Sequence, residues 1–125
     1  MPSILMIDDD ADFSALVSAH FTKRGYTVLV APDGKEGLAK APVFKPDIIF
    51  LDIMMPGLNG VEVLRELQSL DGTEEVPVIV MSGKYFDQGM HDLFSQERNF
   101  REFLGKPVSL DQLELKTASL LKSGG

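Results

Sequence analysis

The chain has 125 residues, 44% of them hydrophobic and 25% charged, which are the proportions of one soluble globular domain. The absence of cysteine excludes disulfide bonds and thiolate chemistry, and a net charge of −7 argues against a general nucleic-acid binder, which needs a basic face. The first residues lack the basic start of a signal peptide, and no apolar run approaches the roughly 18 residues of a membrane-spanning helix.

Short apolar runs alternate with segments of helical spacing along the whole chain. The runs predict strands at residues 4–7, 26–30, 47–51, 76–81 and 100–104. The segments between them predict helices at residues 12–24, 35–41, 60–70, 87–96 and from Ser109 onward. Pro42 and Pro46 are expected to bracket a loop, because proline interrupts a helix.

Three of the predicted helices carry apolar residues at the spacing of one helix face. The residues expected to face the sheet are Phe13, Leu16, Val17 and Phe21; Met90, Leu93 and Phe94; and Leu110, Leu113, Leu120 and Leu121. Leu115 lies off the last face and is either a lone exposed leucine or part of a dimer contact. We expect His20 to be packed and His91 to be partly exposed, and neither is assigned a role because neither has a ligand-like neighbour in the pattern.

Five strand–helix units predict an α/β protein with helices on both faces of a parallel sheet. Right-handed crossovers favour a flavodoxin-like, three-layer (βα)5 sandwich with the strands in the spatial order 2-1-3-4-5. In that order the first and third strands are neighbours. We therefore expect Asp8, Asp9 and Asp52, which end these strands, to lie close together.

Asp52 ends a buried apolar run and precedes a turn rich in proline and glycine. An acid at this place is either the cap of the next helix or a functional group at the edge where α/β sheets bind ligands. Pro56 and Gly57 separate Asp52 from that helix, which weakens the cap interpretation.

Three converging carboxylates repel one another, and a hard divalent cation relieves the repulsion. Mg²⁺ is the expected ion, with Mn²⁺ as a possible substitute, because Mg²⁺ binds a few carboxylates together with water and phosphate oxygens. Asp10 and Asp12 are instead expected to serve the start of the first helix, where acids are favourable.

Two further predicted strands end in polar residues, Ser82-Gly83 and Lys106-Pro107. A hydroxyl and an ammonium group beside a carboxylate–metal site would bind phosphoryl oxygens. Taken singly, Ser82 is more simply a turn residue and Lys106 a solvated lysine. Compatible groups at four strand ends favour a phosphoryl-binding site.

Together these motifs resemble the receiver domain of two-component response regulators, over essentially the whole chain. The matching segments are residues 4–10, 51–60 and 80–83 and Lys106-Pro107. The resemblance implies a receiver domain over residues 1–122, with residues 123–125 as a disordered tail or the start of a linker. Both a stand-alone regulator and part of a longer protein are compatible with it.

The resemblance implies that Asp52 is the phosphoacceptor in a phosphorylation-activated switch, which receives its phosphoryl group from a phosphohistidine in a Mg²⁺-dependent reaction. Asp9 and Asp52 would bind the metal directly, together with the backbone carbonyl of Met54. Asp8 would contribute through water.

The resemblance also implies a set of switch residues. Ser82 and Lys106 would contact the phosphoryl oxygens, and Lys106 would be followed by a cis bond to Pro107. Phe103 would be the switch aromatic, and its lack of a hydroxyl means that packing alone would drive its burial.

The implied partners are a histidine kinase or histidine phosphotransfer protein, and a downstream protein. The downstream protein would bind the surface formed by residues 87–96, residues 100–104 and the last helix. The domain would be a cytoplasmic monomer or weak homodimer without direct contact with nucleic acid or membrane. It would be no enzyme beyond catalysing its own phosphorylation and dephosphorylation.

Some positions depart from the usual family pattern. Met54 cannot orient a hydrolytic water, and Lys84 is available to contact the phosphate, so we expect a long-lived phosphorylated state. The stretch 84–99 lacks the usual alanine-rich helix, which leaves the helix length and the partner surface open. It carries instead Phe86, Phe94 and Glu97-Arg98-Asn99.

Two alternatives stay open. A haloacid-dehalogenase-like phosphatase would use Asp8-x-Asp10, Ser82 and Lys106, but it would leave Asp52 without a role and would need a later acidic strand end. A degenerate receiver would bind partners without phosphorylation, although the complete set of acids argues against it. The position of a label from a small phosphodonor separates the three cases.

Overall fold

Five parallel strands form one sheet in the order β2-β1-β3-β4-β5 in the computed structural model, which describes residues 2–83 and 87–123. The strands are β1 (Ser3–Ile7), β2 (Thr27–Ala31), β3 (Ile48–Asp52), β4 (Val78–Ser82) and β5 (Phe100–Gly105). The predicted flavodoxin-like strand order is therefore confirmed.

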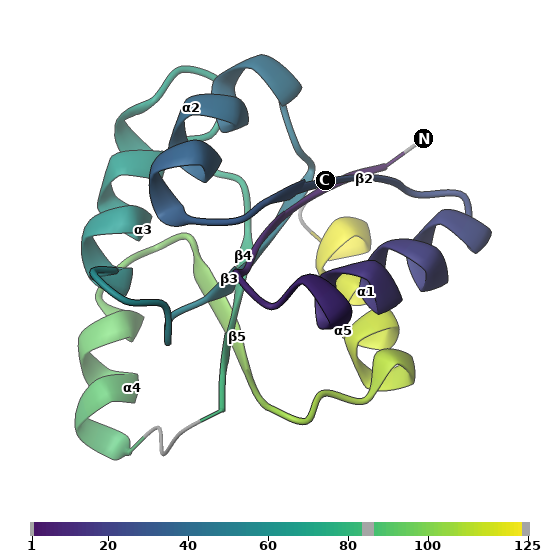
Figure 1. Ribbon diagram of the computed structural model, residues 1–125. Coiled ribbons are helices and arrows are strands. Elements are labelled where there is room, and N and C mark those ends of the chain that lie inside the picture. Colours follow the sequence, from purple (N-terminus) through teal and green to yellow (C-terminus); the bar gives the residue numbers. More distant parts are fainter. Residues whose placement is uncertain (1, 84–86, 124–125) are drawn as a thin grey trace.

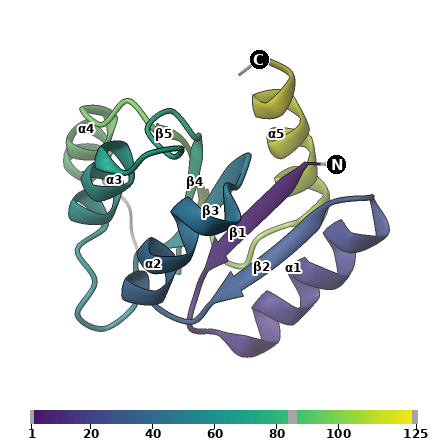
Figure 2. The ribbon, with the colours of Figure 1, turned by 90° about the horizontal axis from the view of Figure 1, so that it is seen from above.

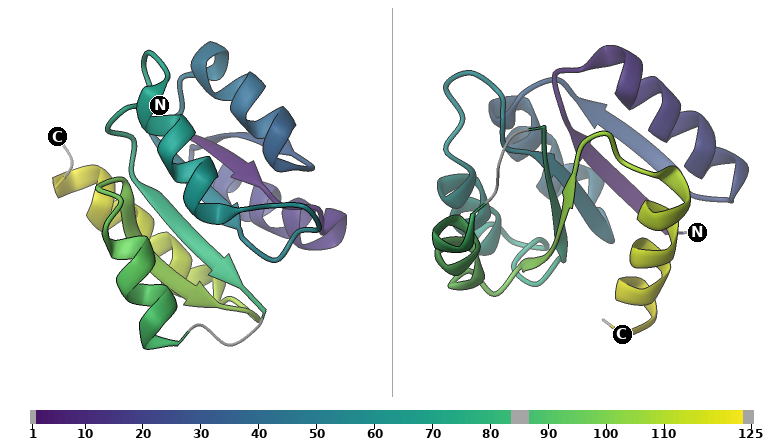
Figure 3. Two further views of the ribbon diagram at one scale, coloured as in Figure 1. Left: turned by 90° about the vertical axis from the view of Figure 1, so that its left-hand side faces the viewer. Right: turned by 90° about the horizontal axis from the view of Figure 1, so that it is seen from below.

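Five helices within these ranges cover the two faces of the sheet: α1 (Ala11–Lys23), α2 (Gly34–Phe44), α3 (Gly60–Ser69), α4 (Gln88–Ser95) and α5 (Leu110–Ser123). Helices α1 and α5 cover one face, and α2, α3 and α4 cover the other (Figures 1 and 2). The latter three lie side by side (Figure 3). None of the described helices has the length and apolar character needed to span a membrane.

Two parts of the sequence-based expectations fall outside the described ranges. One is the segment with Lys84 and Phe86, and the other is residues 124–125 of the expected tail. Ser123, the first residue of that tail, is the last residue of α5.

The central strands are buried on both faces, which is why their sequences are continuous apolar runs. Along β3, Ile49 and Leu51 belong to the core beneath α2, α3 and α4. Ile48 and Phe50, which alternate with them, belong to the core beneath α1 and α5. Packing on both faces of β3 thus fixes the position of its last residue, Asp52, at the carboxyl end of the strand.

Polar side chains fix where the helices begin. Asp10, Asp33 and Asn59 precede α1, α2 and α3, and the side-chain oxygen of each accepts a hydrogen bond from the first turn. Such a cap contributes about 1 kcal/mol to helix stability. Because Asn59 caps α3, with its oxygen 3.1 Å from the Val61 nitrogen, Asp52 is not the cap of that helix.

Helix α2 continues through Pro42, so the loop expected between Pro42 and Pro46 is wrong at its start. The proline removes one main-chain hydrogen bond. Continuing the helix, however, lets Phe44 pack against the core beneath α2, α3 and α4. The helix ends at Lys45, which has a left-handed φ of 55° and donates its N–H to the Ala41 carbonyl at 2.9 Å.

Two leucines expected on buried helix faces are exposed. Leu16 of α1 is 61% exposed and Leu93 of α4 is 47% exposed, so both predictions are wrong. The buried stripe of α1 runs through Val17 and Phe21, and that of α4 through Phe94. Consecutive residues of a helix point about 100° apart, so the residue just before a narrow stripe turns towards solvent.

Gly60, the first residue of α3, lies directly against α4. A Cβ atom at this position would come within 2.9 Å of Cζ of Phe94 and 2.8 Å of Cγ2 of Ile53. These distances are too short for carbon atoms, so glycine is what lets the Phe94 ring enter. Phe94 is only 4% exposed and is the buried residue of α4.

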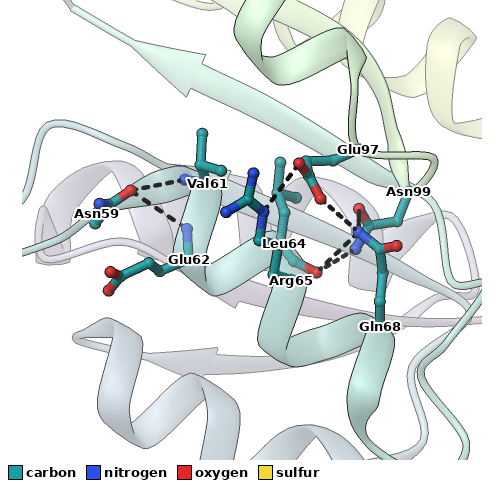
Figure 4. A network of polar contacts seen from close by, with 8 residues as sticks. All are labelled: Asn59, Val61, Glu62, Leu64, Arg65, Gln68, Glu97 and Asn99. Atoms are coloured by element: carbon teal, nitrogen blue, oxygen red, sulfur yellow. Dashed lines mark hydrogen bonds and ion pairs between the residues drawn. The ribbon is translucent and has the colours of Figure 1, made fainter.

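A partly buried polar network joins α3 to the loop between α4 and β5 (Figure 4). Glu97 accepts hydrogen bonds from Arg65 Nε and Gln68 Nε2, both at 3.1 Å. Asn99 accepts one from Gln68 Nε2 at 3.0 Å and donates one to the Leu64 carbonyl at 2.9 Å. We call Arg65, Gln68, Glu97 and Asn99 the α3–loop network. It gives the unusual segment Glu97-Arg98-Asn99 a structural role.

Candidate functional site

Four strand ends bring polar side chains to one edge of the sheet. Asp8 follows β1, Asp52 ends β3, Ser82 ends β4 and Lys106 follows β5. Carboxylate oxygens of Asp8, Asp9 and Asp52 all lie within 4.8 Å of one another. The predicted convergence of the three acids is therefore confirmed.

Asp8 and Asp52 are held in the same way. Each uses Oδ1 to accept a hydrogen bond from the N–H two residues further on, from Asp10 at 2.9 Å and from Met54 at 2.8 Å. Each uses Oδ2 to contact Lys106 Nζ, at 2.9 Å for Asp8 and 3.1 Å for Asp52. The backbone thus fixes one oxygen of each carboxylate, and one ammonium group bridges the other two.

Burial sets the electrostatics of this site. Asp8 and Asp52 are 1% and 4% exposed, whereas Asp9 is exposed. Burial raises the pKa of Asp8 above its ordinary value, and the hydrogen bond from Lys106 only partly offsets this. Burial alone would lower the pKa of Lys106, but the hydrogen bonds and charges of the two acids outweigh it and raise that pKa. Three carboxylates facing one ammonium leave the site with an excess of negative charge.

The remaining predicted residues differ in how deeply they are buried. Ser82 is 1% exposed, and its carbonyl accepts a hydrogen bond from the Lys106 N–H at 2.8 Å. Met54 is 39% exposed. Phe103 of β5 is partly buried against the core beneath α2, α3 and α4. The peptide bond between Lys106 and Pro107 is cis, as the resemblance implies.

An aromatic ring lies beside Lys106, at a residue for which the apolar pattern predicts only packing. The ring centroid of Phe13 is 4.8 Å from Lys106 Nζ. Both residues line a hollow of about 520 Å³ that also includes Leu16 and Val108. Recognising Asp10 as the N-cap of α1 could have indicated this position from the sequence. Phe13 lies three residues after Asp10, so it is in the first turn of α1 and next to the strand ends.

His20 does have a ligand-like neighbour, so the expectation of none is wrong. Its Nε2 lies 2.8 Å from Glu114 Oε1, and Arg24 Nε lies 3.2 Å from the other oxygen of Glu114. Asp111 is close enough to complete a group of possible metal ligands. The contact pairs α1 with α5 across 94 positions of sequence, which no local pattern reveals. His91 is exposed, and its ring lies edge-on to another aromatic ring.

The chain resembles known proteins along its whole length. The family model for the response regulator receiver domain matches residues 4–118. Protein PilH of Pseudomonas aeruginosa is 36% identical over 124 residues, which cover 99% of this chain and 100% of PilH. Transcriptional activator protein PfeR of the same species is 36% identical over 121 residues, but this chain spans only 38% of its length.

Solved structures show the same fold. The receiver domain of the Francisella response regulator 1452 matches with a TM-score of 0.85 at 29% identity, over 100% of both chains. The receiver domain of the sensor histidine kinase PA1611 from Pseudomonas aeruginosa matches with a TM-score of 0.83 at 23% identity, over 97% of this chain and 98% of that one. The PA1611 structure has a magnesium ion coordinated in its active site cleft.

Proposed function

The chain belongs to the response regulator receiver domain family of two-component systems, and we propose that it is a phosphorylation-activated switch with Asp52 as phosphoacceptor. Receiver domains are signalling domains rather than classical enzymes. The observation that carries the proposal is the way Asp52 is held, with one oxygen on the Met54 N–H and the other on Lys106. This places a preorganised carboxylate at the sheet edge where α/β folds bind ligands.

The proposed donor is a phosphohistidine on a histidine kinase or a histidine phosphotransfer protein. A carboxylate oxygen of Asp52 forms a P–O bond while the P–N bond of the donor breaks, and the imidazole leaves with a proton. Lys106 Nζ, 3.1 Å from Asp52 Oδ2, is placed to neutralise the oxygens of the transferred group. The chain then catalyses its own phosphorylation and, more slowly, its own dephosphorylation.

The acidic residues fit a divalent cation. Three carboxylates offer the hard oxygen ligands that Mg²⁺ prefers, and their excess charge raises the affinity for a cation. We propose that Asp9, Asp52 and the backbone carbonyl of Met54 bind Mg²⁺ directly, that Asp8 acts through water, and that Mn²⁺ can substitute. The ion, when bound, supplies charge neutralisation at the phosphoryl oxygens. The magnesium reported in the PA1611 cleft is consistent with this assignment.

Phosphorylation adds about −1.5 to −2 charges at the sheet edge. We propose that the Ser82 hydroxyl donates to one phosphoryl oxygen and that Lys106 pairs with another. Phe103 would then change its packing on β5, driven by apolar contact alone. These shifts would alter the surface of α4, β5 and α5, which we propose as the face for a downstream protein.

The hollow beside Lys106 supports a protein donor. A partner that delivers a phosphoryl group to Asp52 has to cover the adjacent surface. That surface includes Leu16, a large apolar residue that is 61% exposed. Exposed apolar area next to a reactive group is typical of a contact site for another protein.

We propose the following organisation for the whole domain. It spans residues 1–122 and is a cytoplasmic monomer or weak homodimer, without direct contact with nucleic acid or membrane. Leu115, which is 71% exposed on α5, is available for a weak dimer contact. The relatives include PilH, which is matched along its full length, and PfeR, which is longer. They therefore include both a protein of this size and a receiver within a longer protein.

Met54 leads us to propose a long-lived phosphorylated state. Met54, which is 39% exposed and donates its N–H to Asp52, has a thioether side chain that is too weak a hydrogen-bonding group to orient a water for hydrolysis. The purified phosphodomain should therefore lose its label slowly. Rapid loss in the presence of Mg²⁺ would count against this part of the proposal.

Labelling with a small phosphodonor and Mg²⁺ tests the proposed function. We expect label on Asp52 in the wild type, no label in Asp52→Asn, and normal label in Asp71→Asn, a control at an exposed acid in another turn. Label on Asp8 would support the phosphatase instead. Absence of label from a folded wild type would support a degenerate receiver.

A further inference from the structure

Among the residues that the structure describes, three contact the ammonium group of Lys106. The Oδ2 atoms of Asp8 and Asp52 lie 2.9 and 3.1 Å from its Nζ, and the Phe13 ring centroid lies 4.8 Å away. Both carboxylates change in the proposed reaction, because Asp52 gains a phosphoryl group and Asp8 shares its charge with a cation. The Phe13 ring takes part in neither event, so it is the neighbour whose charge the proposed reaction does not change.

The Phe13 ring is tied to the site by the start of α1. Asp8 Oδ1 accepts a hydrogen bond from the Asp10 N–H at 2.9 Å. Asp10 Oδ1 in turn accepts one from the Phe13 N–H at 3.0 Å. The ring also packs partly buried against the core beneath α1 and α5. Two hydrogen bonds thus fix the backbone at the start of α1 relative to Asp8, and packing against this core places the ring.

A neighbouring aromatic ring helps to hold the ammonium group of a lysine in this position. Its side chain has four rotatable bonds, so much of its freedom is lost when its ammonium is held in one place. The face of an aromatic ring carries partial negative charge and attracts an ammonium group within about 6 Å of the centroid. The Lys106 side chain is only 19% exposed, and attraction of this kind is stronger in such a partly desolvated place.

We propose that Phe13 is a positioning residue for phosphoryl transfer, because its ring holds the Lys106 ammonium at the end of β3. The inference rests on the proposed function of Asp52. Phe13 would touch neither the phosphoryl group nor the metal, and would act through Lys106. Any apolar residue can fill the space, but only an aromatic one can hold the cation.

Matched substitutions separate these two properties. Phe13→Leu keeps an apolar, helix-compatible side chain and removes the ring, whereas Phe13→Trp restores an aromatic face. Phe44→Leu makes the same exchange at a partly buried phenylalanine of α2, outside the site. Each protein is phosphorylated with a small donor, so that contact with a partner protein plays no part. Circular dichroism confirms that each variant is folded.

We expect Phe13→Leu to lower the rate constant for phosphorylation of Asp52 about 3–10-fold. Phe13→Trp and Phe44→Leu should remain within about twofold of the wild type. Mg²⁺ affinity, measured by calorimetry, should be the same in all four proteins, because the proposed role of the ring is to hold Lys106 and not the acids. An unchanged rate in Phe13→Leu, or a rate in Phe13→Trp as low as in Phe13→Leu, overturns the proposal.

A second measurement does not depend on phosphorylation. In the unphosphorylated protein, the methylene protons next to Lys106 Nζ should show an upfield ring-current shift in NMR spectra. Phe13→Leu should abolish the shift and increase the mobility of the Lys106 side chain. If the wild type takes up no label, but Lys106 is more mobile in Phe13→Leu than in the wild type, the proposed function is refuted and the positioning contact is not. Equal Lys106 mobility in both proteins refutes the positioning contact, whatever the labelling shows.

Discussion

Within residues 2–83 and 87–123, carboxylates are buried in two places, which differ in how fully their charge is compensated. In the α3–loop network each oxygen of Glu97 has its own donor, and Asn99 uses both ends of its amide. At the sheet edge, Asp8 and Asp52 share a single ammonium group, and a third acid lies beside them. The network satisfies its own charge, whereas the site has more negative charge than its residues neutralise.

This difference separates a structural cluster from a functional one. A buried charge that has all its partners fixes the position of the elements it joins. A buried charge left partly uncompensated lowers stability and raises the affinity for a cation or another compensating group. The raised pKa of Asp8 is the sign of that cost. We therefore expect substitutions to affect stability in the network and reactivity at the sheet edge.

Lys106→Ala should have the largest effect, and that effect should be on reactivity at the sheet edge. Loss of a preorganised cationic group should lower the phosphorylation rate on the order of 100-fold or more. The measurement is label incorporation from a small phosphodonor at fixed Mg²⁺. Lys122→Ala, which removes an exposed lysine of α5, serves as control. A wild-type rate in Lys106→Ala would remove Lys106 from the transfer step.

Glu97→Ala should disrupt the α3–loop network and lower the stability of the fold. Arg65 and Gln68 would each lose a hydrogen bond to Glu97, although Arg65 is 60% exposed and can turn to water and Gln68 keeps its hydrogen bond to Asn99. We expect the free energy of unfolding to fall by about 1–3 kcal/mol in urea titrations. Glu66→Ala on the exposed side of α3 is the matched control. Unchanged stability together with impaired phosphorylation would reverse the two assignments.

Asp8→Asn sharpens the comparison, because it should make the fold more stable while weakening Mg²⁺ binding. It removes a charge that burial disfavours, and we expect a gain of about 0.5–2 kcal/mol at neutral pH without Mg²⁺.

The gain from Asp8→Asn should depend on pH. The pKa of Asp8 in the folded state is raised above 3.8, so the buried charge lowers the stability of the wild type at neutral pH. The wild type regains this stability as the pH falls through the raised pKa towards 3.8, because Asp8 becomes protonated. The stability gap between variant and wild type should therefore close in mild acid. Urea titrations at several pH values measure the gap, and a less stable variant at neutral pH would contradict the assignment.

Ser14→Ala tests the smallest case. Ser14 of α1 is 3% exposed, and its hydroxyl has no hydrogen-bond partner among the described residues. Removing an unsatisfied buried hydroxyl should stabilise the protein by about 0.5–1 kcal/mol, with no change in phosphorylation. Ser18→Ala, at a less buried position of the same helix, is the control. Destabilisation, seen as a lower thermal midpoint, would indicate that the hydroxyl is satisfied in solution.

Sequence alone predicts the strand order and the meeting of Asp8 with Asp52 for one reason. Parallel strands with right-handed crossovers have few possible arrangements, and each arrangement fixes which strand ends are neighbours. The same reasoning brings Ser82 and Lys106 to the same edge. Information of this kind lies in strand ends, so a local pattern is sufficient to find it.

The contacts that sequence does not predict depend on how the helices are placed. Phe13 of α1 meets Lys106 after β5, and His20 of α1 meets Glu114 of α5, because α1 has a particular rotation and distance from the elements beside it. Helix rotation depends on the sum of many packing contacts, as the exposed Leu16 shows. The continuation of α2 through Pro42 is similar, because tertiary packing outweighs a local rule.

The close approach of Gly60 and Phe94 limits how this domain can diverge in evolution. A methyl group at position 60 would occupy space that the Phe94 ring already fills, so the two positions have to change together. A lineage that replaces the glycine must also accept a smaller side chain on α4. Recombination that transfers α4 from one receiver to another will therefore succeed only where position 60, on a different helix, already matches the incoming residue.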